Sequence, residues 1–289
     1  MALPVLFGAN VDPTWKDPGQ PLRTAELAES LGYDLVTVQD HPYQPAFYET
    51  WTLITHLAAK TSRVTLVPTV ACLPLRPPAM LAKSAATLDL LSGGRLQLGL
   101  GAGAFWDAIA AMDGPRRTPK EAVDALGEAV DVIRAMWSGG RSVRYDGEHY
   151  RLRGTHPSPQ PGNGLGLWLG AYGKRMLDLT GAKADGWMPS AAYLPVERLS
   201  DAVGRIRASA ERADRDPDAL RLVYNISGTI GAESTTPFHG SSAQWVDQLV
   251  RLNQDLGMNA FVYWPAADHK EQLAEFAHTV LPAVRSALN

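Results

Sequence analysis

The sequence predicts an α/β fold: a single (β/α)₈ TIM barrel that covers residues 1–289 and carries a small insertion before its fifth strand. Short strand-like runs alternate with longer helical patterns almost from end to end, and eight such repeats favour a closed barrel over an open sheet. Most of the runs are apolar on both faces, as strands buried in a parallel sheet must be. The length of 289 residues also suits one barrel with an insertion.

The first strand is expected within Met1–Gly8. This segment lacks a basic region followed by a long apolar stretch, so it does not resemble a signal peptide. Seven further strands are expected at residues 35–38, 64–67, 96–100, 165–169, 184–188, 220–226 and 260–264.

Two of the intervening helices have clear start signals. Thr118 and Glu121 are spaced as a capping box, with Pro119 suited to the first turn of the helix that follows. Asp268 and Glu271 have the same spacing before the last helix. The apolar positions of that last helix are Leu273, Phe276, Val280 and Val284.

The insertion is expected at about residues 139–162. Alternating residues on both sides of Asp146-Gly147 predict a hairpin, and a stretch rich in proline and glycine, 157–162, leads into the next strand.

Composition excludes several function classes. The formal net charge of −3 and a pI near 6.2 give no support for nucleic-acid binding. A single cysteine, Cys72, excludes an internal disulfide and suits a reducing compartment. No apolar run is long enough to cross a bilayer, so we expect a cytoplasmic protein without a membrane partner.

Asp40-His41 follows the second expected strand, at the barrel end where chemistry takes place. A histidine there can act as a general acid or base, and the alternative is a loop histidine that only caps a turn before Pro42. The other histidines show no metal-ligand spacing, so we expect no metal site.

Two glycine-rich segments follow later strands. Gly99–Ala104 matches a loose G-x-G-x-x-G/A pattern, but a loop runs from Phe105 to the helix at Thr118, so its context does not fit a dinucleotide site. We expect Gly101 and Gly103 instead to let loop backbone approach a flat ligand.

The second glycine segment comprises Gly170, Ala171, Tyr172, Gly173 and Lys174 and opens a helix. Free N–H groups at a helix start, together with a cation, suit a phosphate; the alternative is an ordinary tight turn.

The end of the third strand, from Thr69 to Leu73, is compact and apolar, and Cys72 is expected to be a buried filler rather than a nucleophile. Four tryptophans near strand ends could form an aromatic wall for a planar ring: Trp106, Trp168, Trp187 and Trp264.

Longer motifs resemble the luciferase-like flavin-dependent oxidoreductases. The first is residues 81–95 (LAKSAATLDLLSGGR) with 98–103 (LGLGAG), and the second is 159–161 (PQP), 167–170 (LWLG) and 184–187 (ADGW). The resemblance spans most of the chain. Members of the family use FMN or coenzyme F-420, an 8-hydroxy-5-deazaflavin.

The resemblance implies several site assignments. The tricyclic ring would lie in the barrel mouth, supported by a bulge with a non-prolyl cis peptide within Thr69, Val70 and Ala71. The cofactor phosphate would lie on Gly170 to Lys174. Asp40-His41 matches the pair that supplies the proton-transferring histidine in the sugar-phosphate dehydrogenases of the family, with Asp40 orienting His41. A homodimer is also implied.

The chain departs from that sugar-phosphate subgroup. Pro42–Pro45 lacks the tryptophan found shortly after Asp-His, and Ala104 stands where the subgroup has an acid, which argues against a sugar-phosphate substrate. The leading hypothesis is therefore hydride transfer between F-420 and a small organic substrate. The alternatives are an FMN-dependent monooxygenase with a partner flavin reductase, a non-catalytic flavin-binding barrel, and a nicotinamide dehydrogenase that rests on the strand-four glycines alone.

Overall fold

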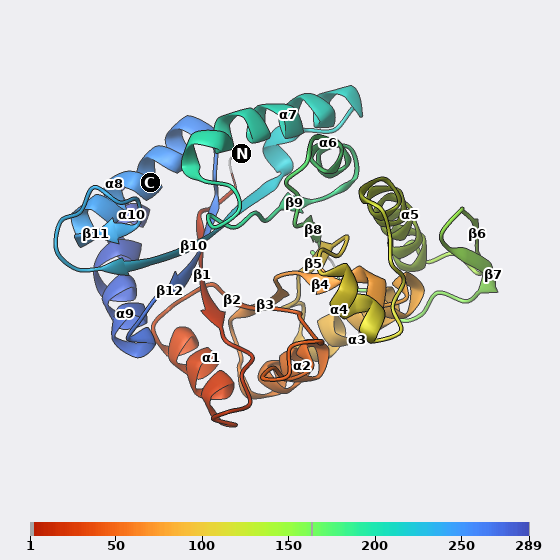
Figure 1. Ribbon diagram of the computed structural model, residues 1–289, viewed down its shortest axis with the longest axis horizontal. Helices are drawn as coiled ribbons and strands as arrows, with labels where there is room; N and C mark the ends of the chain where they lie inside the picture. The colour runs from red at the N-terminus through yellow and green to blue at the C-terminus, as the bar shows by residue number, and fades with distance from the viewer. Residues whose placement is uncertain (1–2, 163, 289) are drawn as a thin grey trace.

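The computed structural model describes residues 3–162 and 164–288 and shows a parallel sheet that is nearly closed into a barrel, with helices outside it (Figure 1). The strands follow the path β3-β2-β1-β12-β10-β9-β8-β5-β4, and neighbours along it are parallel. A bridge between Leu66 on β3 and Leu96, two residues before β5, links the β3 end of the path back to its other side. The (β/α)₈ prediction is thereby confirmed, whereas Met1, Ala2, Asn163 and Asn289 lie outside the described residues.

All eight expected strands are present; β2 has the predicted bounds and the ends of the others are shifted. They are β1 Leu6–Val11, β2 Leu35–Val38, β3 Thr65–Pro68, β5 Leu98–Gly101, β8 Leu167–Leu169, β9 Gly186–Trp187, β10 Arg221–Ile230 and β12 Ala260–Pro265. Two short strands add to them, β4 Ala71–Cys72 and β11 His239–Gly240. The strand β4 matters for function, because it resumes pairing with β5 after β3 has ended.

The helices surround the barrel (Figure 1). They are α1 Gln20–Ser30, α2 Thr50–Lys60, α3 Pro78–Ser92, α4 Trp106–Ala111, α5 Pro119–Trp137, α6 Lys174–Lys183, α7 Leu199–Arg212, α8 Ser242–Leu256, α9 His269–Glu275 and α10 Leu281–Leu288. Short 3₁₀ turns occupy Leu73–Leu75, Val196–Arg198 and Pro217–Ala219. None of these helices is both long and apolar enough to cross a bilayer.

The two predicted capping boxes have different outcomes. At α5, the Thr118 side chain accepts from the Glu121 N–H, and the Glu121 carboxylate accepts from the Thr118 N–H, so this prediction is confirmed. At α9, Asp268 has a left-handed backbone (φ 45°) and makes no side-chain cap, so the second prediction is wrong. The last helix is also interrupted by a π-turn over Phe276–Val280, which the apolar spacing did not reveal.

The insertion forms the predicted hairpin, β6 Val143–Asp146 and β7 Arg151–Thr155, which lies at the edge of the molecule beyond α5 (Figure 1). The carboxylate of Glu128 on α5 accepts three backbone N–H bonds from its turn, at residues 148, 149 and 150. These bonds hold the hairpin turn to α5, on the outside of the barrel.

The barrel interior has its own small apolar core. It comprises Leu35, Val67, Trp168, Met188, Val223, Ala260 and Val262, separate from the larger core between strands and helices. Since side chains alternate along a strand, the next inward positions toward the carboxyl ends belong to Thr37, Asn225 and Trp264. The interior therefore changes from apolar to polar just below the mouth.

Candidate active site

The mouth is bounded on one side by a break between β3 and β4. The Thr69–Val70 peptide bond is cis, and the Thr69 N–H donates to the carbonyl of Val38 on β2 (2.8 Å). Pairing then passes to β5 through Ala71, opposite Leu100. The non-prolyl cis peptide expected within Thr69-Val70-Ala71 is confirmed.

Val70 fills a space that two glycines leave open. A Cβ on Gly101 would lie 2.6 Å from a Val70 methyl carbon, and a Cβ on Gly170 would lie 3.1 Å from the same atom. The first distance is shorter than any normal carbon contact and the second is tight. Gly101 and Gly170 thus leave the space that the Val70 side chain occupies at the mouth, a role that the sequence did not suggest.

His41 lies half-buried at the mouth. Its Nδ1 is 2.7 Å from the Tyr43 hydroxyl, and its ring contacts Tyr43, Phe47 and Phe105. Burial lowers the pKa of His41 below 6.5, with the charge of Asp40 opposing this shift, so the imidazole is neutral at pH 7. Burial also raises the pKa of Tyr43, which keeps its hydroxyl protonated. The ring is therefore held as a neutral base by a hydroxyl that can both donate and accept.

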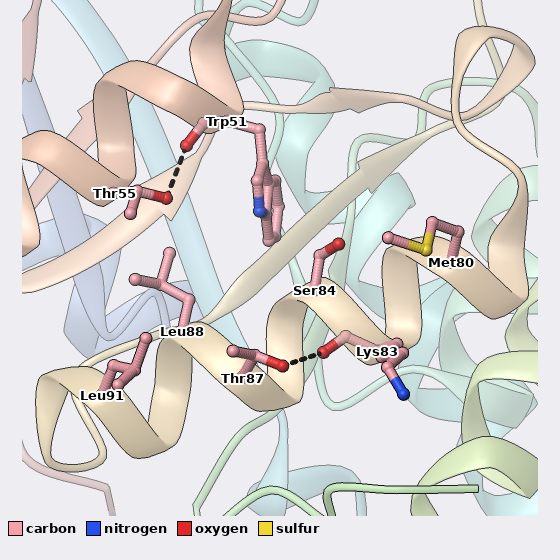
Figure 2. A pocket seen from close by; sticks show the side chains of 8 residues that line it. All are labelled: Trp51, Thr55, Met80, Lys83, Ser84, Thr87, Leu88 and Leu91. Atoms are coloured by element: carbon pink, nitrogen blue, oxygen red, sulfur yellow. Dashed lines mark hydrogen bonds between the residues drawn. The ribbon is translucent and has the colours of Figure 1, made fainter. Parts of the chain in front are cut away.

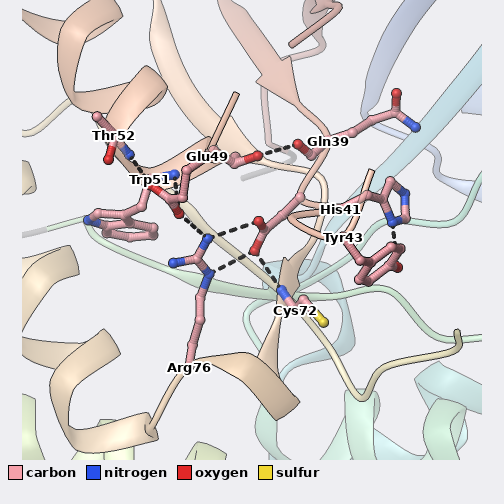
Figure 3. Close-up of polar contacts among 10 residues, drawn as sticks. Gln39, His41, Tyr43, Glu49, Trp51, Thr52, Cys72 and Arg76 are labelled. Carbon is pink, nitrogen blue, oxygen red and sulfur yellow. Dashed lines mark hydrogen bonds and ion pairs between the residues drawn. The ribbon is translucent and has the colours of Figure 1, made fainter. Parts of the chain in front are cut away.

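Asp40 does not orient His41, and this part of the sequence prediction is wrong. One Asp40 oxygen accepts from the Arg76 Nε (2.7 Å) and the Cys72 N–H (2.8 Å), and the other accepts from the Arg76 NH2 group (2.9 Å). Successive side chains of an extended segment point to opposite sides, so Asp40 faces the barrel wall while His41 faces the mouth. Figure 3 shows Arg76 on one side of this segment and the His41–Tyr43 pair on the other.

The Asp40 carboxylate and Arg76 form a buried ion pair that Glu49 extends (Figure 3). The Asp40 side chain is 1% exposed and that of Arg76 is 16% exposed. Glu49 also caps α2 by accepting from the backbone of Thr52. This network fixes the start of β4, and with it the far end of the bulge.

Cys72 is buried, as expected. Burial raises the pKa of its thiol to about 12, so the thiolate needed for a nucleophile does not form near neutral pH.

The segment Gly170–Lys174 leads from β8 into α6, as predicted. Ala171 is buried and its carbonyl accepts from the Trp187 indole (2.8 Å), while Tyr172 accepts from the Ser190 N–H (3.1 Å). Gly173 is the N-cap of α6, and Lys174 is exposed. Within the described ranges Lys174 has no acidic partner, whereas Arg175 pairs with Asp124 (2.6 Å). The first N–H groups of α6 and the Lys174 ammonium are thus available to an anion.

The segment that follows the strand-four glycines differs from the sequence prediction. A short helix, α4, begins at Trp106 directly after the loop, where the sequence predicted only a loop as far as Thr118. Gly103 has a φ of 93°, and a Cβ there would lie 2.7 Å from Pro74, so its role is to let the loop pack closely.

The four tryptophans do not form one wall. Trp168 belongs to the interior core below the mouth, and Trp187 is buried in the outer core. Trp106 opens α4. Only Trp264 has the inward position on β12 next to the polar layer.

Two polar atoms at this level have no protein partner in the described chain. They are the Asn225 Oδ1 and the Trp264 Nε1, on the adjacent strands β10 and β12. One is an acceptor and the other a donor, and both are buried. Asn225 was missed by sequence reasoning, because one asparagine within an apolar strand gives no motif; its place on the inward face could have identified it.

A shallow groove lies elsewhere, between α2 and α3 on the outer surface (Figure 2). Trp51 and Thr55 line it from α2, and Met80, Lys83 and Leu91 are among the residues that line it from α3. It belongs to the outside of the barrel and not to the mouth. Within the described residues, no three histidine, cysteine or acidic side chains gather as metal ligands.

The sequence profile described as luciferase-like monooxygenase matches residues 2–259. This chain belongs to that family. It is accordingly an oxidoreductase, as the resemblance implied.

Curated relatives include the F420-dependent glucose-6-phosphate dehydrogenase of Mycolicibacterium smegmatis, 31% identical over 237 residues, which cover 75% of this chain and 68% of the relative. The 5,10-methylenetetrahydromethanopterin reductase of Archaeoglobus fulgidus is 31% identical over 205 residues, which cover 71% of this chain and 58% of the relative. The matched segments therefore span about three fifths to two thirds of these relatives.

Solved structures share the fold of this luciferase-like chain over nearly its full length. An F420-dependent secondary alcohol dehydrogenase superposes with a TM-score of 0.85 at 20% identity, covering 98% of this chain and 99% of that one. The EDTA monooxygenase of Chelativorans sp. BNC1 gives 0.81 at 14% identity, covering 98% and 94%.

Proposed function

We propose that this luciferase-like enzyme transfers hydride between coenzyme F-420 and a small organic substrate, with His41 moving the accompanying proton. The observation that carries the proposal is a neutral, half-buried imidazole at the barrel mouth beside the Thr69–Val70 bulge. The F-420 dependence of the curated relatives supports the choice of cofactor.

The residues at the mouth fit a deazaflavin. Such a ring has a pyrimidinedione edge with both donors and acceptors, which complements the unpaired Asn225 Oδ1 and Trp264 Nε1. Val70 offers a partly exposed apolar surface for the ring, with Thr69 beside it, whereas Ala71 is fully buried and would support the ring only from behind. The cofactor phosphate would bind Gly173 and Lys174 at the start of α6, next to Gly170, Ala171 and Tyr172.

When bound, F-420 supplies hydride transfer at its deazaflavin ring. The neutral His41 accepts the hydroxyl proton of a substrate that is being oxidised, and in the reverse direction the His41 imidazolium returns a proton to the carbonyl oxygen. For Nε2 to accept that proton, Nδ1 must carry the N–H of the neutral ring. The Tyr43 hydroxyl then accepts from Nδ1–H in both the neutral and the protonated state, which fixes this tautomer. Tyr43 is thus the residue that positions His41, in place of Asp40.

Titration of the purified protein with F-420 and, separately, with FMN tests the cofactor assignment by fluorescence. We expect F-420 to bind at least about tenfold more tightly than FMN, a difference of about 1.4 kcal/mol. The reverse preference would favour the FMN-dependent monooxygenase with a partner reductase. Binding of neither cofactor at micromolar concentration would favour a non-catalytic barrel.

Two lysine variants locate the phosphate in the same titration. Lys174→Ala is expected to weaken F-420 binding about tenfold, since a hydrogen bond to a charged group contributes about 1.5–3 kcal/mol. Lys183→Ala is the matched control, because Lys183 lies at the other end of α6 and pairs with Asp131. Equal affinities for the two variants would place the phosphate elsewhere.

The direction of the His41 shift sets the pH dependence of turnover. The oxidative direction needs the neutral imidazole, and burial places the pKa of His41 below 6.5. We therefore expect kcat/KM for oxidation to stay level from pH 8 down to about 6.5 and to fall only at lower pH. For reduction, which needs the imidazolium, kcat/KM should fall as the pH rises. A break above pH 7 in the oxidative profile would assign the proton to another group.

The homodimer and the cytoplasmic location are further parts of this proposal. Sedimentation equilibrium of the purified chain tests the first, and cell fractionation tests the second.

A further inference from the structure

Four side chains at the mouth form one aromatic patch: His41, Tyr43 and Phe47 from the β2–α2 loop and Phe105 from the β5–α4 loop. The ring centroids of Phe105 lie 5.6 Å from His41 and 5.8 Å from Tyr43, and Phe47 lies 6.5 Å from His41. The strands β2 and β5 are not neighbours, since β3 and β4 stand between them. The two loops therefore converge over the β3–β4 bulge.

The patch leaves apolar surface open to a ligand. Phe105 is 49% exposed although its ring touches His41, and Tyr43 and Phe47 are only partly covered. An exposed aromatic side chain that packs on a half-buried imidazole is typical of a binding surface. A substrate whose oxygen reaches His41 must therefore place its body against Phe105 and Tyr43.

The segments that form the patch and the bulge beneath it carry no lysine or arginine that could bind an anion. Segments 41–48, 69–75 and 102–105 contain no lysine or arginine, and His41 is neutral at pH 7. Arg76 is occupied by Asp40 and Glu49. The adjoining β1–α1 loop bonds to Ala46 through the Trp15 N–H and carries Lys16 between Asp12 and Asp17. The charge beside the patch is thus neutral to negative, which disfavours a phosphorylated or carboxylated substrate.

We propose that the substrate of this enzyme is a neutral alcohol, or the corresponding carbonyl compound, with an aromatic or alicyclic group that lies on the aromatic patch. This inference rests on the proposed F-420-dependent function. In oxidation the substrate carbon loses hydride to F-420, the O–H bond breaks as His41 takes the proton, and a C=O bond forms. The alcohol is oxidised and F-420 is reduced, so atoms and electrons balance without another reactant.

The test compares three probes in one direction, with oxidised F-420: 1-phenylethanol, 2-propanol and glucose 6-phosphate. We expect kcat/KM for 1-phenylethanol to exceed that for the other two by about tenfold or more. Phe105→Ala should lower kcat/KM for 1-phenylethanol about tenfold. It should change kcat/KM for 2-propanol by about twofold or less, because only the phenyl group contacts Phe105. Met112→Ala is the matched control, since Met112 is 47% exposed at the end of α4 and lies outside the patch.

A second readout does not depend on the cofactor. Saturation-transfer NMR should detect 1-phenylethanol on the free protein, with a weaker signal for Phe105→Ala and an unchanged one for Met112→Ala. Binding with this pattern but without F-420 turnover would refute the proposed function and retain the patch as the site for the apolar group. Preference for glucose 6-phosphate, an unchanged 1-phenylethanol to 2-propanol ratio in Phe105→Ala, or neither binding nor turnover of 1-phenylethanol would overturn the inference.

Discussion

Replacement of His41 by alanine is expected to lower kcat about 10²–10⁴-fold, the range that a positioned general acid or base contributes. The physical reason is that His41 is the titratable group that the mouth presents beside the bulge, neutral and held by Tyr43. Binding of F-420 should change little, because the groups that fit the cofactor ring are Val70, Asn225 and Trp264 and those that fit its phosphate are at the start of α6. Single-turnover kinetics and the fluorescence titration measure the two quantities separately.

His56→Ala is the matched control for that substitution, since His56 is an exposed histidine on α2. It should leave both kcat and F-420 affinity unchanged. A loss of less than a few-fold in His41→Ala, with cofactor still bound, would show that His41 is a structural residue of the loop and that another group moves the proton.

The second large effect is expected in stability. Asp40→Ala should lower the free energy of unfolding by about 3 kcal/mol, because removing one partner of a buried ion pair leaves the other charge uncompensated. Arg76 would lose both bonds to Asp40 and keep only its contact with Glu49, and the Cys72 N–H would lose its acceptor. The retained Glu49 places the loss at the lower end of the usual range of about 3–5 kcal/mol. Urea unfolding followed by circular dichroism measures the change.

Asp17→Ala provides the comparison, since Asp17 pairs with Arg23 on the surface and both side chains are more than half exposed. That pair should contribute less than about 1 kcal/mol. Similar unfolding free energies for the two variants would mean that the Asp40–Arg76 pair contributes no more than an exposed one.

The sequence could predict the barrel because its evidence is local and repeated. Apolar runs at residues 35–38 or 260–264 are strands in any parallel sheet, and the capping box at Thr118 is formed by residues three apart. The hairpin about Asp146-Gly147 depends on its own turn in the same way. Features that depend on distant packing were less visible. The π-turn at Phe276–Val280 buries Phe276 and Val280 in the core, and the left-handed backbone of Asp268 is an exposed turn that the capping-box spacing did not reveal.

The candidate site also has features that follow from the local sequence and features that depend on contacts between distant segments. The sequence by itself determined the fold class, the position of His41 and Lys174 at strand ends, the acid-base chemistry available there and, through motif resemblance, the family. Each follows from residue type and order along the chain.

Only the tertiary structure decided which groups meet. His41 bonds to Tyr43, while Asp40 pairs with Arg76. Val70 packs against two glycines, and Phe105 in the β5–α4 loop contacts the histidine that follows β2. Closure of the sheet sets these contacts, because it brings loops that are far apart in the chain to one end and fixes which face each side chain takes. Residue type and order thus set the chemistry that is available, and the closed barrel sets which of these residues are in contact.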